Sequence, residues 1–341
     1  MSGIESLSME EQNGFERLSP VDRWWVLLHY AVMAPSGHNA QPWLFRIRGH
    51  TAELRADRRR SLPVVDPQDR ELVIGCGAAL LNLRVAIHHF GLAEQTTLCP
   101  DPADRDLLAR IEILGDGRID PAEDTLFDAI PERRTNRLAF TAEPLPPSLL
   151  DELERAAAME GAWLAPLRAL ADRRRVADLI AEGDLQQAAD PALRAEMAAW
   201  VRSNSSLKRD GLRGYSYGHG HFESLLAPLY IRLVDWGEAQ SKRDHELAVG
   251  APVLAVLGTP GDTVLDWLRA GQALARVLLL AQATGVSASF FNQPVEVPEL
   301  RHRLLACAAA SGSPQLCFRL GRGRPVMPSP RRQVEDVVSG V

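Results

Sequence analysis

Two stretches of the chain are apolar at almost every position of a helical repeat. The first covers residues 71–92, where leucine, valine, isoleucine and alanine predominate, and Gly91 lies near its end. The second contains residues 271–280 and is followed by Gly285. A glycine just after an apolar run is typical of a helix C-terminus, and a helix that is apolar all round is buried. The pattern therefore predicts two central helices.

The two apolar stretches also match each other in register. Setting Gly77 on Gly271 brings Gly91 onto Gly285, with apolar positions aligned between them. Such self-similarity is typical of an internal repeat, and the alternative is two unrelated buried helices. The repeat predicts two related halves joined by a linker rich in Asp, Gly and Pro. These halves are residues 1–118 and 119–341, and the linker is residues 115–123.

Shorter patterns around these helices predict a mixed α/β (α+β) chain. Ser19 can cap a helix that begins at Pro20, and Asp22 suits the positive end of its dipole. Apolar runs bounded by turn residues predict strands, and apolar residues at helical spacing predict further helices. The predicted strands are residues 43–47, 52–56, 251–257 and 315–320, and the predicted helices include 125–130, 149–158 and 164–185.

Residues 200–248 lack this regularity. Glycines and aromatic residues occur there without a clear period, which favours a lid insertion in the second half over a core element. Its aromatic side chains either line the lid over a ligand or only pack the insertion together. They are Trp200, Tyr215, Tyr217 and Phe222. After the last strand, residues 328–341 predict an extended C-terminal arm.

A stiff polar loop over residues 34–43 separates the first predicted helix from the first strand. It has the sequence Ala-Pro-Ser-Gly-His-Asn-Ala-Gln-Pro-Trp. Its prolines fix φ, its glycine can adopt φ > 0, and its Ser, Asn and Gln side chains can form hydrogen bonds. Such a loop can hold donors and acceptors toward a flat heteroaromatic ligand, or it is an ordinary connection between a helix and a strand.

A second candidate site is the basic segment Arg133-Arg134-Thr135-Asn136-Arg137. Guanidinium groups bind phosphate bidentately, and the threonine hydroxyl can donate as well. The segment therefore suits a phosphomonoester. The alternative is a surface run paired with nearby acids such as Glu132.

Composition narrows the function classes. The chain has 341 residues, 46% of them hydrophobic, and a net charge of -6, which indicates a globular protein and no nucleic-acid partner. The polar N-terminus has no signal-like core, and Arg276 interrupts the best candidate for a membrane span, so we expect a cytoplasmic protein with no membrane contact. The four cysteines are far apart, and His219 and His221 lack a third ligand at recognisable spacing, so no metal site is expected.

The order of these motifs resembles the FMN-dependent nitroreductase superfamily. A helix, the Ala-Pro-Ser-x-x-Asn-x-Gln-Pro-Trp loop, the Arg-Arg-Thr-x-Arg segment, a buried helix and an arginine-bearing arm occur in that order between Ser19 and Arg332. The loop occurs only in the first half and the arginine segment only in the second. This arrangement is similar to the Acg branch, in which two fused pseudo-symmetric nitroreductase-like halves mimic the family homodimer and hold one FMN. Residues 288–296 also look like that branch.

The resemblance implies roles for individual residues. Arg133 would clamp the FMN phosphate with Arg134 and Thr135, and Arg137 would supply a cation near the flavin N1 and C2 carbonyl. The loop would contact the flavin ring, and the C-terminal pair Arg331 and Arg332 would reach the phosphate, with Arg322 and Arg324 as competitors. The loop contacts would come from Pro35, Ser36, Gly37, Asn39 and Gln41. Asn292 and Gln293 would face the flavin N5 edge, in place of the family's common acid-glycine pair.

The resemblance further implies an oxidoreductase that uses NAD(P)H to reduce FMN and then reduces a nitroaromatic, a quinone or a similar acceptor. Its alternative is a protein that stores or sequesters FMN with little turnover under a closed lid. A third possibility is the same fold without flavin. The fused halves would act as a monomeric pseudo-dimer or assemble as a homodimer.

Overall fold

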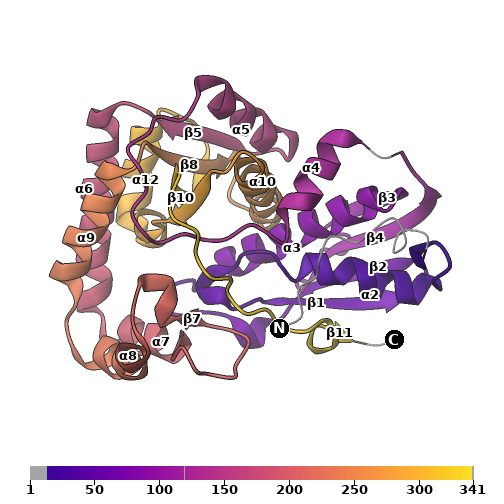
Figure 1. Cartoon of the computed structure of the whole chain (residues 1–341), viewed down its shortest axis with the longest axis horizontal. Helices are drawn as coiled ribbons and strands as arrows, with labels where there is room; N and C mark the ends of the chain where they lie inside the picture. The colour runs from indigo at the N-terminus through magenta and orange to yellow at the C-terminus, as the bar shows by residue number, and fades with distance from the viewer. Residues whose placement is uncertain (1–13, 119, 340–341) are drawn as a thin grey trace.

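The computed structural model of the chain describes residues 14–118 and 120–339. Two β-sheets lie on either side of a central pair of helices, α3 (Arg70–His89) and α10 (Val264–Ala283) (Figure 1). The predicted central helices and the mixed α/β class are therefore confirmed. The predicted boundary after residue 118 falls on residue 119, which lies outside the described residues, as does most of the N-terminal stretch.

The first sheet has five strands in the order β11-β1-β2-β4-β3. Its neighbours run antiparallel except β11, which pairs in parallel with β1. Because β11 comes from the C-terminal arm, the end of the chain joins the sheet of the first half. The strands are β1 (Trp43–Arg48), β2 (Thr51–Ala56), β3 (Leu92–Leu98), β4 (Leu107–Asp116) and β11 (Val338–Ser339).

The second sheet is antiparallel throughout, with the order β5-β8-β10-β9. Its two middle strands, β8 and β10, confirm the strands predicted near residues 251–257 and 315–320. A separate pair of two-residue strands, β6 and β7, lies in the predicted lid. The strands are β5 (Trp163–Leu167), β6 (Val201–Arg202), β7 (Leu212–Arg213), β8 (Val253–Thr259), β9 (Ser287–Phe290) and β10 (Ser313–Gly321).

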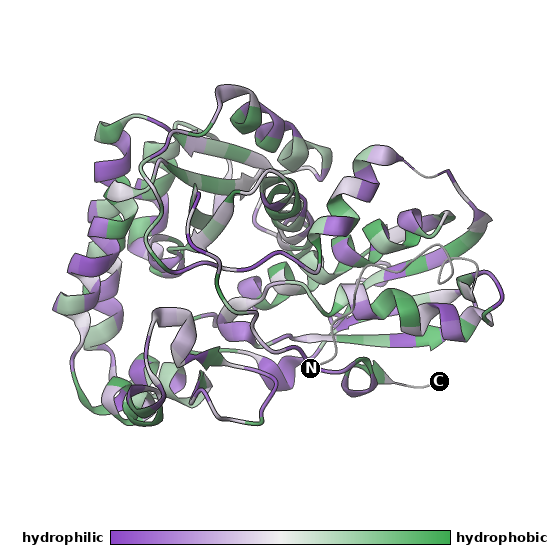
Figure 2. Ribbon diagram, in the orientation of Figure 1, coloured by the Kyte–Doolittle hydropathy of each residue, from purple (hydrophilic) through white to green (hydrophobic). Residues whose placement is uncertain are grey.

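Helices pack on both faces of the second sheet, whereas in the first sheet β4 alternates buried residues with exposed ones. Figure 2 shows hydrophilic residues along the outer helices α6 and α9, and apolar residues concentrated on the central helices and inner strands. Ser19 caps α2 through the Asp22 amide, as predicted. The remaining helices are α2 (Pro20–Ala31), α4 (Pro121–Ala129), α5 (Pro147–Met159), α6 (Leu170–Ala189), α7 (Pro191–Trp200), α8 (His221–Leu233), α9 (Gly237–Gly250), α11 (Gln293–Glu296) and α12 (Pro298–Ala308).

Two predicted elements need correction. Residues 164–185 were predicted as one helix, but the structure divides them between strand β5 and helix α6. Residues 200–248 were predicted as irregular, but most of them form helices α8 and α9, and α9 packs along α6. Only the part between α7 and α8 lacks long elements, so the region that can cover a site is shorter than predicted.

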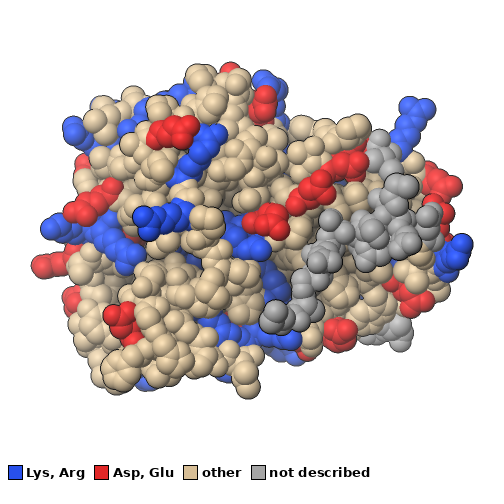
Figure 3. Space-filling view, in the orientation of Figure 1, with Lys and Arg blue, Asp and Glu red and all other residues tan. Residues whose placement is uncertain are grey.

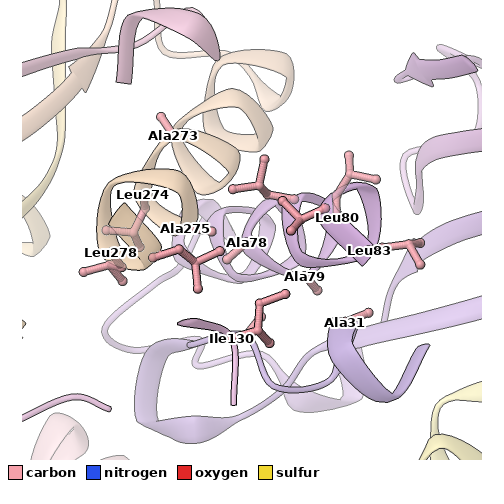
Figure 4. Packing of buried hydrophobic residues seen from close by; sticks show 14 of the residues in the cluster. Ala31, Ala78, Ala79, Leu80, Leu83, Ile130, Ala273, Leu274, Ala275 and Leu278 are labelled. Carbon is pink, nitrogen blue, oxygen red and sulfur yellow. The ribbon is translucent and has the colours of Figure 1, made fainter. Parts of the chain in front are cut away.

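The two central helices cross at the glycines that the sequence placed in register. A β carbon on Gly77 would lie 2.2 Å from the Leu268 carbonyl oxygen, and one on Gly271 would lie 2.0 Å from the Ile74 carbonyl oxygen. Small residues around the crossing, among them Ala78 and Ala275, allow the backbones to approach (Figure 4). Side chains from both sheets and both helices form one continuous core. The internal repeat itself stays a prediction.

Helix α3 is also the described helix that is long and apolar enough to cross a membrane, which the sequence prediction overlooked. Within its most apolar 18-residue window, 83% is buried inside the protein. Its central position between the two sheets accounts for this composition, because a helix covered on all sides gains nothing from a polar face.

Candidate functional site

A cavity of about 220 Å³ lies between the start of α3, the middle of α10 and strands β9 and β10. Part of its wall is apolar and is formed by Ile74, Leu274, Phe290 and Leu316. Most of the predicted site residues also line it, from both halves of the chain. These are Pro35, Ser36, Gly37, Asn39, Thr135, Arg137, Asn292, Gln293 and Arg331. The others, Gln41, Arg133, Arg134 and Arg332, do not line this cavity.

The loop over residues 34–43 has an unusual backbone. His38, Asn39 and Gln41 have φ angles of 49°, 55° and 54°, in the left-handed region that non-glycine residues rarely adopt. Gly37, the residue of this loop that can adopt such a φ without strain, does not do so. Gly37 instead provides space, since a β carbon there would lie 3.3 Å from Oε2 of Glu71. Strained residues of this kind persist where surrounding contacts hold them.

Gln41 supplies several of those contacts and is fully buried. Its backbone N–H donates to Ser36 Oγ at 2.8 Å. Its side-chain amide donates to the Arg209 carbonyl at 2.7 Å, and its Oε1 accepts the Arg332 backbone N–H at 2.7 Å. Gln41 therefore connects the loop to the lid segment and to the C-terminal arm. It does not line the cavity, but it holds the loop that does.

The arginine segment lies along the edge of the second sheet. Thr135 forms an isolated parallel bridge with Ala288 of β9, and the Asn136 N–H donates to the Ala288 carbonyl at 2.9 Å. Buried Arg319 supports the segment from below, since it donates to the Leu138 carbonyl at 2.9 Å. These contacts hold the segment against the same cavity as the loop of the first half.

Three guanidinium groups gather beside the cavity. Arg133 is 6% exposed, and among the described residues its guanidinium has no hydrogen-bond or ion-pair partner. Burial, together with the charges of Arg331 and Arg134, lowers the pKa of Arg133 to about 9. Burial and the charge of Arg134 also lower the pKa of Arg331 to about 10. In the view of Figure 3, which has the orientation of Figure 1, Lys and Arg side chains lie near the middle of the molecular surface.

The acid proposed as a surface partner of this segment does little to neutralise it. Glu132 is exposed. Burial lowers the pKa of Arg134, and the charge of Glu132 offsets only part of this effect. Arg134 donates instead to the Arg133 carbonyl at 3.0 Å. A buried cluster of like charges without a matching carboxylate is costly, so the arrangement suits an anion.

Among the competing C-terminal arginines, Arg331 is the one that reaches the cavity wall. It donates to Asn39 Oδ1 at 3.0 Å and to the Met33 carbonyl at 3.2 Å. Arg332 points to the loop backbone and donates to the Gln41 carbonyl at 2.9 Å. Arg322 pairs with exposed Glu143, and Arg324 is exposed.

Arg137 and His38 both line the cavity, and the charge of Arg137 acts on His38. The Arg137 guanidinium lies 5.0 Å from the centre of the Tyr217 ring, so Tyr217 lines the site as a lid residue. Burial, and then the charge of Arg137, lowers the pKa of His38 to about 4. His38 is therefore neutral at pH 7 and can donate and accept one hydrogen bond each.

Asn292 and Gln293 line the cavity, but their side-chain amides bind neighbouring groups. Asn292 Oδ1 accepts the Cys317 backbone N–H at 3.1 Å, which directs its Nδ2 to Glu71 Oε1, also at 3.1 Å. Gln293 Nε2 donates to Asp184 at 2.9 Å. Their predicted place at the flavin N5 edge stays a prediction.

Asp184 makes a testable contribution to stability. Burial, and then the nearby charge of Asp244, raises the pKa of Asp184 to about 8, whereas an aspartate in an unfolded chain titrates at about 4. As the pH rises from 4 to 8, the unfolded chain loses this proton and the folded protein keeps it, so stability falls. We expect the melting temperature of Asp184→Asn, relative to wild type, to rise over this range. Parallel melting curves from pH 4 to 9 would contradict the assignment.

Helix α7 and the following segment cover the cavity. Leu193, Glu196 and Met197 line it from α7. The Glu196 carboxylate accepts the backbone N–H groups of Val64 and Val65, both at 3.0 Å. The cover is therefore fastened to the first half of the chain. The other predicted lid aromatics do not line the cavity, and Phe222 is 74% exposed.

No protein-family model matches the sequence. Two Mycobacterium tuberculosis proteins named "Putative NAD(P)H nitroreductase" are similar to the chain over most of its length. The one designated Rv3131 is 34% identical over 320 residues, which cover 92% of this chain and 90% of that protein. The chain belongs to the nitroreductase family. The relative designated acg is 29% identical over 319 residues, covering 90% of this chain and 92% of that protein.

Solved nitroreductase structures are also similar to this nitroreductase-family chain. One is the FMN-dependent nitroreductase NfnB from Mycobacterium smegmatis in complex with NADPH, with 16% identity and a TM-score of 0.40. The match covers 64% of this chain and 98% of that chain.

Sequence reasoning missed several residues that line this cavity. His38 lies inside the loop that was singled out, but its left-handed backbone gave no signal in the sequence. Glu71 and Glu296 line the cavity, and each looks like an ordinary helix-end residue when the sequence is considered alone. Only their distance in space, which a single sequence does not give, marks them as a pair.

Proposed function

We propose that this protein binds one FMN in the cavity and uses NAD(P)H to reduce a nitroaromatic, a quinone or a similar acceptor. One observation carries the proposal: Arg137 and Arg331 of the second half and the loop over residues 34–43 of the first half (the Pro-Ser loop) line one cavity, and buried Arg133 lies close to Arg331. Family membership supports it, since relatives of the chain are named "Putative NAD(P)H nitroreductase".

The residues present fit FMN in charge and in polarity. Arg133 and Arg331 would hold the phosphate, because neither guanidinium has a carboxylate partner among the residues that the structure describes. Ile74, Leu274 and Phe290 offer apolar wall to a flat ring system. Guanidinium groups form charge-assisted hydrogen bonds with phosphate oxygens, which would relieve the repulsion within the cluster.

The chemistry that FMN supplies when bound is two-electron transfer from NAD(P)H, through its N5 atom, to the acceptor. The chain's own residues would bind FMN, orient the acceptor and exclude water. Arg137 would place a positive charge beside the cavity, where it stabilises negative charge that develops during reduction. Neutral His38 would donate one hydrogen bond without adding charge, and α7 would limit the entry of water and of large acceptors.

An FMN-storage protein with little turnover is the second candidate, and the fastened cover favours it. Besides the contacts of Glu196, Arg60 of the first half binds Asp210 of the cover at 2.6 Å, and Arg202 binds the same carboxylate at 3.1 Å. A cover held to the first half by the Arg60–Asp210 ion pair and by the contacts of Glu196 would bar NAD(P)H unless it opens.

One experiment separates these candidates. Purified protein is incubated with FMN, its visible spectrum is recorded, and NADPH and nitrofurazone are then added. An active enzyme bleaches with NADPH and turns over nitrofurazone, whereas a storage protein stays yellow and unreactive. A protein that takes up no FMN would overturn both candidates. Asp210→Asn, which weakens the fastening of the cover, should increase turnover if the cover limits access.

The architecture and the setting of the protein complete the proposal. Two fused halves, with the loop from one and the arginine segment from the other, would form one complete flavin site. The chain would act as a monomeric pseudo-dimer or as a homodimer in the cytoplasm. Light scattering of the purified protein distinguishes the two assemblies.

A further inference from the structure

Two carboxyl groups lie side by side in the cavity wall, and the proposed function leaves them without a role. Glu71 belongs to the first turn of α3, and Glu296 is the last residue of α11. Both line the cavity, and their side chains are within hydrogen-bonding reach of each other. Two ionised carboxylates this close repel each other, which favours a proton retained by the pair.

Neighbouring side chains fix the orientation of the pair. Arg70 Nη2 and Asn292 Nδ2 both donate to Oε1 of Glu71, at 3.0 and 3.1 Å. Gln187 Nε2 donates to Oε2 of Glu296 at 2.6 Å. Oε2 of Glu71 lies against Gly37 of the Pro-Ser loop, where an added β carbon would be 3.3 Å away. The pair is therefore held at the meeting point of the loop and the cavity.

The charges that face the pair favour a retained proton. Burial, and then the charge of Glu296, raises the pKa of Glu71 to about 8, although Arg70 opposes this. Burial also raises the pKa of Glu296. Asp66, in the loop before α3, adds a further carboxyl group, and burial followed by the charge of Glu71 raises its own pKa to about 6. Arg70 is the facing cation among the described residues.

We propose that the Glu71–Glu296 pair donates a proton to the acceptor that is reduced in this cavity, an inference that rests on the proposed function. A quinone becomes a hydroquinone by gaining one hydride equivalent and one proton. The hydride equivalent, with both electrons, originates from NAD(P)H. The proton passes from the carboxyl O–H to a carbonyl oxygen of the quinone, so one O–H bond breaks and another forms. The pair then regains a proton from water.

The protonation of the pair can be measured without turnover. Infrared spectra of the flavin-free protein between pH 5 and 10 report the C=O stretch of protonated carboxyl groups. The difference between wild type and Glu71→Gln should contain one such band that disappears near pH 8. Glu299→Gln is the matched control, because it makes the same chemical change at an exposed position three residues after Glu296. A featureless difference spectrum would contradict the shared proton.

The donor role is tested by stopped-flow absorbance on the FMN-loaded protein. After reduction with NADPH, the protein is mixed with benzoquinone, and the rate of reoxidation is followed from pH 6 to 10. We expect Glu71→Gln to slow reoxidation about 100-fold, with little change in the rate of reduction by NADPH. The wild-type rate should fall as the pH rises through about 8, and Glu299→Gln should behave as wild type.

Glu296→Gln provides a second variant if Glu71→Gln does not fold, and the same slow reoxidation is expected. Variants that bind FMN but reoxidise at the wild-type rate would overturn the donor role and leave the proposed function intact. A wild-type protein that binds no FMN would overturn the proposed function, and the donor role with it.

Discussion

Replacing Arg133 by methionine should raise the melting temperature of the flavin-free protein and weaken FMN binding at the same time. The Arg133 guanidinium is buried without a partner among the described residues, and two like charges lie nearby. Removing a buried, uncompensated charge stabilises the folded state, by about 1 to 3 kcal/mol here. The same change deletes charge-assisted hydrogen bonds to phosphate, which contribute about 1.5 to 3 kcal/mol each.

Calorimetry of the flavin-free protein and a fluorescence titration with FMN measure the two effects separately. Arg322→Met is the matched control, since Arg322 forms an exposed ion pair with Glu143, and exposed pairs contribute little. A less stable flavin-free Arg133→Met protein would show that Arg133 has a structural role. Unchanged FMN affinity would show that it does not bind the phosphate.

The second large effect is expected at the crossing of the central helices. Gly271→Ala should lower the free energy of unfolding by about 3 kcal/mol or more, because the added methyl group would lie 2.0 Å from the Ile74 carbonyl oxygen. The helices would have to move apart, and the cavity between them would change with them. FMN affinity should therefore fall together with stability.

Gly250→Ala is the control for the crossing. Gly250 ends helix α9 and has nothing within 4 Å of an added β carbon, so the same substitution should be neutral or slightly stabilising. Urea unfolding of both variants gives the comparison. Equal stabilities for Gly271→Ala and Gly250→Ala would mean that the helices do not approach as closely as described.

Periodicity was sufficient to predict the centre of the fold. The two apolar stretches are helices, and the glycines aligned in sequence, Gly77 and Gly271, contact each other in space. The reason is physical: an apolar surface that covers a whole helix can be stable only between other layers, and close packing there requires small residues.

Periodicity failed where short elements adjoin long ones. Strand β5 has the sequence Trp-Leu-Ala-Pro-Leu, and its apolar residues merged with the helical pattern that follows. Its proline is tolerated because β5 is an edge strand of the second sheet. Whether a strand lies at an edge becomes clear only when the strand order of the sheet is known. The helices α8 and α9 were missed because many of their residues are polar or exposed.

The candidate site was predicted in part. Motifs with their own local signal, the Pro-Ser loop and the arginine segment, contribute residues to one cavity, and their binding of FMN stays a prediction. Groups that depend on tertiary contacts were not found, because neither the left-handed backbone of His38 nor the pairing of Glu71 with Glu296 has a local signal. That Arg133 has no partner among the described residues likewise becomes visible only once its neighbours are placed.

The central claim is that arginines of one half and the loop of the other hold the two ends of one FMN. Its most direct test compares the affinities of FMN and riboflavin, which differ by the phosphate, in wild type and in the Arg133→Ala/Arg331→Ala double variant. The account predicts that wild type prefers FMN by about 10² to 10⁴-fold, and that the double variant loses this preference while it still binds riboflavin. An unchanged preference in the double variant, or no binding of either flavin to wild type, would contradict it.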